Sequence, residues 1–174
     1  ALTGMVANLT IDRKGHEKYW QQMKDIANRT EKIQKILIMA ITADAEAFEQ
    51  VMAARKLPRN TEAEKQNRLA AMEKSLQKAA QVPLDVARQA LIILEMCQVA
   101  VNCGNPNTIT DGAVAAMMAR TAVLGAIYNV KINLISITDA SFTDLLASQS
   151  EELTRKAIGL EKDILHSVDE SMKP

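Results

Sequence analysis

The sequence predicts an all-α fold, a single-domain bundle of long antiparallel helices formed by residues 1–174. Apolar residues recur at steps of three and four along most of the chain, which is the spacing of one helix face. The segment from Glu17 to Lys56 contains no glycine or proline, and no segment alternates polar and apolar residues convincingly. With 174 residues, 48% of them hydrophobic, the chain can bury a sizeable core.

The first half of the chain contains two expected helices and the start of a third. Residues 1–11 are typical of the end of a helix, so we expect the start of the domain to lie upstream. The long helix over 17–56 ends at residues 57–60, Leu-Pro-Arg-Asn, because proline disfavours helix at the residue before it. Thr61 is followed three residues later by Glu64, a capping box that starts the next helix.

This third helix runs toward Cys103. We expect a kink at Pro83, because proline lacks the N–H that continues the helical hydrogen-bond ladder. Residues 102–107 contain glycine, proline and asparagine and form the clearest loop in the sequence.

A fourth helix is expected to begin near Thr110 or Asp111, since either side chain can cap it, and to extend to about Ile135. A short connection at 137–139 then leads to the last helix. Its apolar residues again have helical spacing: Phe142, Leu145, Leu146, Leu153, Ala157, Leu160 and Ile164.

Composition disfavours several classes of function. Basic and acidic residues balance at 21 each, and aromatic residues make up 3%, so neither charge nor stacking surfaces indicate a nucleic-acid partner. Cys97 and Cys103 lie six residues apart on one predicted helix and point to different sides, so they cannot readily form a disulfide with each other. This favours free thiols in a reducing cytoplasm. The two histidines have no neighbour at zinc-ligand spacing, so we expect no metal.

One apolar run, residues 113–137, approaches the length of a membrane span. Polar and charged residues interrupt it, which favours a buried helix of a bundle and no membrane partner: Arg120, Asn129, Lys131 and Asn133. Long, alanine-rich helices in a small domain often present more apolar surface than one chain can cover. We therefore expect a homodimer or higher homo-oligomer, built through helix faces that the sequence does not identify.

Asp44 is the most conspicuous polar residue. It lies three residues after Ile41 and four before Phe48, so a helix places it within an apolar stripe that we expect to face the core. A carboxylate there must find a partner or shift its pKa. This makes Asp44 a candidate acid, base or cation binder, and a helix N-cap or a buried structural pair is the alternative.

Three other polar residues are weaker candidates. Asn129 and Asn133 are four apart on one helix face, where their amides can either hydrogen-bond a neighbouring helix or bind a flat polar ring. Asp111 is either a helix cap or a ligand contact.

Lys56 and Arg59 flank the break after the helix that carries Asp44. The helix dipole alone favours cations there, but both could also hold a substrate carboxylate. Lys56 is about 18 Å along the helix from Asp44, so the two residues could contact only opposite ends of an elongated ligand.

Three blocks of the sequence resemble the cyclodeaminase/cyclohydrolase family of folate enzymes. The first is Ala-Asp-Ala-Glu-Ala-Phe at 43–48, followed by residues 53–61 and 64–65. The second is Cys-Gly-Asn at 103–105, leading to Thr110-Asp111 and residues 114–116. The third is Gly-Ala-Ile-Tyr-Asn-Val-Lys-Ile-Asn-Leu at 125–134. Their order matches the family across nearly the whole chain, which makes the combination specific.

The resemblance implies an all-helical dimer that acts on one-carbon tetrahydrofolate derivatives, with or without a polyglutamate tail, and needs no cofactor beyond that substrate. It implies a formimidoyltetrahydrofolate cyclodeaminase, with methenyltetrahydrofolate cyclohydrolase as the alternative. Asp44 matches the acid of the family's motif and is the expected catalytic residue. Asp111, Asn129 and Asn133 are expected to contact the substrate, and Lys56 and Arg59 its glutamate tail.

A noncatalytic scaffold of the same fold is a further alternative. The family usually has a Gly-Gly-Gly-Ser segment before its first helix, and this sequence begins downstream of that point.

Overall fold

The computed structural model describes residues 1–173, which form helices and short connections without any strand. The α-helices are α1 (Leu2–Asn8), α2 (Trp20–Arg55), α3 (Glu62–Cys103), α4 (Ile109–Leu134) and α5 (Ala140–Ser171). Short 3-10 turns, η1 (Glu17–Tyr19) and η2 (Pro106–Thr108), lead into α2 and α4. The all-α prediction is confirmed.

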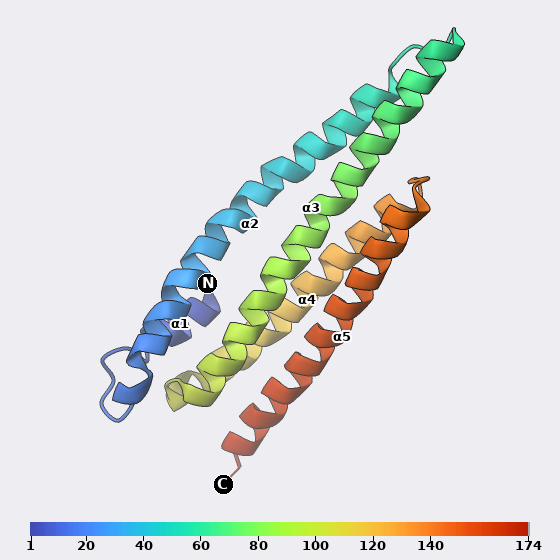
Figure 1. Ribbon diagram of the computed structural model, residues 1–174. Helices are drawn as coiled ribbons and strands as arrows, with labels where there is room; N and C mark the ends of the chain where they lie inside the picture. The colour runs from blue at the N-terminus through green and yellow to red at the C-terminus, as the bar shows by residue number, and fades with distance from the viewer. Residues whose placement is uncertain (174) are drawn as a thin grey trace.

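The long helices form two antiparallel hairpins. α2 and α3 make the longer hairpin, whose tip projects beyond the connection between α4 and α5 (Figure 1). α3 is the central element, because it packs against α2 and also against α4 and α5. α1 packs against α2, α3 and α4 near the opposite end of the bundle (Figure 1).

Most of the predicted helix ends are confirmed. α2 stops at Arg55, shortly before Pro58, and Thr61 caps α3. The capping box is complete: Glu64 N donates to Thr61 Oγ1 at 3.2 Å, and Thr61 N donates to Glu64 Oε2 at 3.0 Å. α3 then continues through Pro83 as a single helix.

The predicted cap of α4 is wrong. Thr110 and Asp111 lie inside the first turn of α4, which begins at Ile109. Thr108 occupies the N-cap position, and its hydroxyl donates to Asn105 O at 2.8 Å instead of capping the helix. The physical reason is η2, whose backbone hydrogen bonds already run up to Ile109 and lead the chain directly into α4.

Small side chains allow α3 and α4 to approach closely. At Gly112 a side chain would not fit, because a Cβ atom there would lie 2.5 Å from Cγ2 of Val101. Buried alanines line the rest of this contact: Ala79, Ala80, Ala87, Ala90 and Ala100 on α3, and Ala113, Ala115, Ala116 and Ala119 on α4. Larger side chains, including those of Leu84, Leu94 and Leu146, complete the core.

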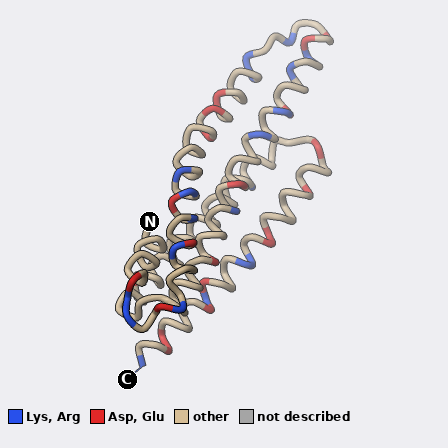
Figure 2. The backbone as a smooth tube through the Cα atoms, turned by 60° about the vertical axis from the view of Figure 1, so that its left-hand side comes forward, with Lys and Arg blue, Asp and Glu red and all other residues tan. Residues whose placement is uncertain are grey.

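The apolar character of α4 follows from its place in the bundle. By length and composition, the segment Pro106–Leu134 could cross a membrane, a test that core helices of soluble proteins also pass. Here α4 packs against α3 and α5, and Arg120 pairs with Glu161 of α5 at 3.4 Å. Charges of both signs are interspersed along α2, α3 and α5 (Figure 2). The prediction of a bundle helix is confirmed.

Polar contacts tie the N-terminal segment to the loop between α3 and α4. Thr10 Oγ1 donates to Val6 O at 2.8 Å and accepts from Asn105 N at 2.9 Å. Gly104 is needed in this loop, because a Cβ atom there would lie 2.2 Å from Ala100 O. Cys97 and Cys103 are free thiols, the first buried and the second half-buried.

Glu73 of α3 holds the connection between α4 and α5. Its carboxylate accepts from Thr138 N at 3.0 Å, Thr138 Oγ1 at 2.9 Å and Asp139 N at 3.0 Å. Asp139 in turn caps α5 by accepting from Phe142 N at 3.1 Å. Partial burial alone would raise the pKa of Glu73, but these hydrogen bonds outweigh it and lower the pKa below its ordinary value of 4.5.

We predict that Glu73→Gln lowers the thermal midpoint at pH 7 by about 2–4 °C, since charge-assisted hydrogen bonds to helix-terminal N–H groups are weakened by about 1 kcal/mol. Because the pKa of Glu73 is lower in the folded protein, its ionised carboxylate stabilises the fold at pH values above the pKa in the unfolded chain. This stabilisation is lost as the pH falls through the pKa in the folded protein. The difference from wild type should therefore be smaller in acid, below the ordinary carboxyl pKa of 4.5, than at pH 7. Circular dichroism at both pH values measures it, with exposed Glu95→Gln on the same helix as the control. Equal midpoints at pH 7 would contradict the prediction.

Candidate functional site

A long groove runs between α2 and α4, with α3 as its floor. Three adjoining cavities of about 350, 440 and 420 Å³ make up the groove. Asp44 and Asn129 line both the first and the second cavity, while Leu37, Ile41 and Ala122 line both the second and the third. The groove is therefore continuous.

The two ends of the groove differ in chemistry. The end near α1 is apolar and is lined mainly by Ile33, Leu37, Ile38 and Ile41 of α2, Ile93 of α3 and Met118 of α4. The other end gathers the polar groups of the site, namely Asp44 and Arg55 of α2 with Asn129, Asn133 and Ser136 from α4 and the segment after it. The polar end therefore offers the few placed polar groups, next to apolar surface, that are typical of a ligand site.

The expectation that Asp44 faces the core is wrong for this chain. Asp44 is exposed, as are Ile41 and Phe48 on either side of it, which are 71% and 64% exposed. The physical reason is that α3 covers only part of the apolar stripe of α2, burying Ile33 and Val51. The rest of the stripe overhangs the groove, so Asp44 needs no buried partner and lies on the groove wall.

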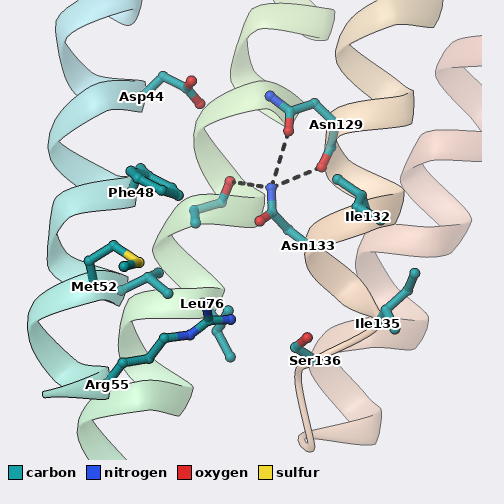
Figure 3. A pocket seen from close by; sticks show the side chains of 12 residues that line it. Asp44, Phe48, Met52, Arg55, Leu76, Asn129, Ile132, Asn133, Ile135 and Ser136 are labelled. Atoms are coloured by element: carbon teal, nitrogen blue, oxygen red, sulfur yellow. Dashed lines mark hydrogen bonds between the residues drawn. The ribbon is translucent and has the colours of Figure 1, made fainter.

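Asp44 faces Asn129 across the groove. In Figure 3 the carboxylate of Asp44 and the amide nitrogen of Asn129 point toward one another from opposite walls, with Phe48 beside Asp44. A carboxylate accepts hydrogen bonds and can take up a proton, whereas an amide nitrogen donates. The pair can therefore bind a flat ring that carries an acceptor next to a donor, against the apolar surface of Phe48.

Asn133 is bound from three sides. Its Nδ2 donates to Asn129 O at 2.9 Å, Asn129 Oδ1 at 3.3 Å and Ala79 O of α3 at 3.1 Å. The structural interpretation, a hydrogen bond between helices, is thus confirmed for Asn133. Asn129 is exposed and makes no such bond to another helix in the described part of the chain, so its role in binding a ligand stays a prediction.

The cation that lines the groove is Arg55, which the sequence analysis missed. Lys56 and Arg59 are exposed at and beyond the end of α2 and do not line the groove cavities. The signal was present in the helical spacing of Asp44, Phe48 and Arg55, because steps of four and seven residues keep side chains on one face. Arg55 lies about 16 Å along α2 from Asp44.

The structure does not bring Asp111 to the other candidates. Asp111 lies in the first turn of α4, eighteen residues before Asn129 on the same helix, which corresponds to about 27 Å. It is half-buried and does not line any of the three cavities. Within residues 1–173, no three His, Cys, Asp or Glu side chains converge to hold a metal ion.

Fold and groove together define an all-helical protein with an open, elongated groove that is polar at one end and apolar at the other. Residues 1–152 match the family model described as formiminotransferase-cyclodeaminase. The chain belongs to this family, and the resemblance found in the sequence is confirmed.

Named relatives include two kinds of enzyme. The chain is 32% identical to a methenyltetrahydrofolate cyclohydrolase of Methylorubrum extorquens over 97% of its length and 81% of that protein. It is 32% identical to the formimidoyltransferase-cyclodeaminase of Rattus norvegicus over 90% of its length, but it spans only 29% of that longer protein. A crystal structure of formiminotetrahydrofolate cyclodeaminase from Thermotoga maritima superposes with a TM-score of 0.86 at 29% identity, covering 97% of this chain and 80% of that one.

We predict that Asp44→Asn changes the thermal midpoint by no more than about 2 °C, because substitutions at exposed positions without partners have small effects. Differential scanning calorimetry of the two proteins measures this. A drop of many degrees would mean that Asp44 has a structural partner and would contradict its placement on the groove wall.

Proposed function

We propose that this enzyme converts 5-formiminotetrahydrofolate to 5,10-methenyltetrahydrofolate with release of ammonia, and that it does so in the cytoplasm. The observation that carries the proposal is the groove, which sets a single carboxylate opposite an amide donor in a chain of this family. The neighbouring structure bears the name of the same activity.

Asp44 is the proposed catalytic residue. In this reaction one folate nitrogen attacks the formimino carbon on its neighbour, a ring closes, ammonia leaves and a delocalised cation remains. The formimino nitrogen starts in its protonated, cationic form; the attacking nitrogen loses one proton, and the departing nitrogen gains that proton and leaves as ammonia. A carboxylate beside the reacting carbon can relay that proton and balance the positive charge. Although Asp44 is exposed in the free protein, a ligand lying in the groove would exclude water from it and strengthen both effects.

The remaining groove residues are proposed to bind the substrate. The amide nitrogen of Asn129 is available for an acceptor atom on the pterin ring, with Asn133 behind it. Arg55, at the end of the groove, suits the carboxylates of the glutamate tail, and Lys56 and Arg59 add positive charge beyond it. Asp111 has no part in this single-chain site. No cofactor beyond the tetrahydrofolate substrate is needed for the proposed reaction.

Methenyltetrahydrofolate cyclohydrolase is the second candidate function. It is favoured by the match over nearly the full chain to a protein of that name. The site would serve equally well, since water attacks the same cation and the ring opens to formyltetrahydrofolate. Asp44 would then activate the attacking water.

We predict that the methenyltetrahydrofolate absorbance band grows when purified protein is mixed with 5-formiminotetrahydrofolate. One equivalent of ammonia should be released for each methenyltetrahydrofolate formed. Asp44→Asn should lower kcat by about 100-fold or more, the effect of losing a general acid–base group. Asp25→Asn, on the same helix but outside the groove lining, is the matched control and should retain wild-type turnover.

Accelerated loss of the band from 5,10-methenyltetrahydrofolate, without growth from the formimino substrate, would replace the first function by the second. A folded Asp44→Asn variant with full turnover would remove Asp44 from the mechanism. No reaction with either substrate would contradict both functions.

We also propose that the protein forms a homodimer through the apolar end of the groove. Ile38, Ile41 and Met118 line that end and are 58%, 71% and 62% exposed. Side chains of this size clustered on one face are typical of surfaces that a partner covers. A second copy packed there would leave the polar end of the groove open to substrate.

We predict a wild-type mass near twice 19.1 kDa by size-exclusion chromatography with light scattering, and a mass near 19.1 kDa for Ile38→Glu. A charge at the centre of an apolar interface is not solvated once buried. Met39→Glu is the matched control, because Met39 is 72% exposed and lies about 100° further round the helix. A monomeric wild type, or a dimeric Ile38→Glu variant, would contradict this interface.

A further inference from the structure

Pro83 leaves one carbonyl of α3 without its helical partner. It lies inside α3, where the N–H of each residue normally donates to the carbonyl four residues earlier. Proline has no N–H, so Ala79 O loses that bond. Ala79 is 7% exposed, and a buried carbonyl without a donor is destabilising.

Asn133 of α4 supplies the missing donor, since its Nδ2 lies 3.1 Å from Ala79 O. The same nitrogen also faces the two oxygens of Asn129. Three acceptors therefore surround this end of the amide. Turning the amide over would place Oδ1 of Asn133 against three oxygens, so the hydrogen-bond pattern admits only one orientation.

The fixed orientation of Asn133 sets that of Asn129. Because Oδ1 of Asn129 accepts from Asn133 at 3.3 Å, its Nδ2 must turn the other way. Figure 3 shows this nitrogen directed across the groove toward Asp44. The interactions thus form a series: Pro83 leaves the carbonyl of Ala79 free, that carbonyl accepts from Asn133, and Asn133 orients Asn129 toward the centre of the groove.

We propose that Asn133 is a positioning residue, anchored on the carbonyl that Pro83 frees, which holds the NH2 group of Asn129 toward Asp44. The groove then presents a preset donor beside an acceptor, the complement of a planar ring with an acceptor next to a donor. Holding the donor in place before binding lowers the entropy lost when the ligand is bound. The identity of the ligand rests on the proposed function, whereas the coupling between Pro83 and Asn133 does not.

A purely structural role for Asn133 makes a different prediction, and Pro83→Ala separates the two. Alanine at 83 restores the N–H that Ala79 O needs, so the helix no longer depends on Asn133. Nothing in that substitution restores the orientation of Asn129. Stability and substrate binding should therefore respond differently to the loss of Asn133.

The experiment compares Asn133→Leu, Pro83→Ala and the double variant by thermal unfolding and steady-state kinetics. Asn133→Leu should lower the thermal midpoint by about 3–6 °C in the wild-type background and by less than half as much in the Pro83→Ala background. Relative to Pro83→Ala alone, the double variant should lose about tenfold in kcat/KM through a higher KM, the same loss that we expect for Asn129→Leu. Val123→Ala, a fully buried change on α4 outside the groove lining, controls for lost stability and should leave KM unchanged.

Equal midpoint losses in the two backgrounds would overturn the link between Pro83 and Asn133. A double variant with the KM of Pro83→Ala would overturn the positioning role and leave Asn133 as a structural residue. A wild-type protein without turnover would defeat the proposed function instead. The thermal comparison would still decide the coupling in that case, because it needs no substrate.

Discussion

The close approach of α3 and α4 through small side chains is the constraint on which the rest of the structure depends. Alanines and Gly112 let the two helices pack with little space between them, and α5 closes the other side of α4. Only one face of α3 then remains for α2, which packs there as the second arm of a long hairpin. Because α2 and α4 lie on separate faces of α3, a groove stays open between them.

This arrangement explains how a helix can be apolar over a wide stripe and still carry the carboxylate that we propose to be catalytic. α3 buries Ile33 and Val51 of the stripe, while Asp44 lies on the part that overhangs the groove. The free protein therefore holds Asp44 in water without a desolvation penalty. A bound ligand would supply the low-dielectric surroundings in which a single charge acts strongly on a reacting cation. The buried part of this helix face thus stabilises the fold, and the exposed part carries the proposed catalytic residue.

Local signals predicted the fold well because each depends on neighbouring residues. Pro58 and the Thr61–Glu64 capping box mark the turn between α2 and α3, and Asp139 marks the start of α5. α4 begins one or two residues before the start that the sequence predicts, because the backbone hydrogen bonds of η2 lead directly into it. No side-chain motif in the sequence marks those bonds. In the site, the spacing of Asn129 and Asn133 correctly placed both on one face, but Arg55 was overlooked in favour of Lys56 and Arg59.

The sequence by itself determined the helices, their order, the cap of α3 and the family, because periodicity, turn residues and motifs depend on residues that are close together in the chain. Only the tertiary structure decided that Asp44 is exposed, that it lies opposite Asn129, and that the Ala79 carbonyl meets Asn133. These facts depend on which face of α2 the central helix covers and on the relative positions of α3 and α4. Helical spacing defines a face of a helix, but it does not state what, if anything, packs against it.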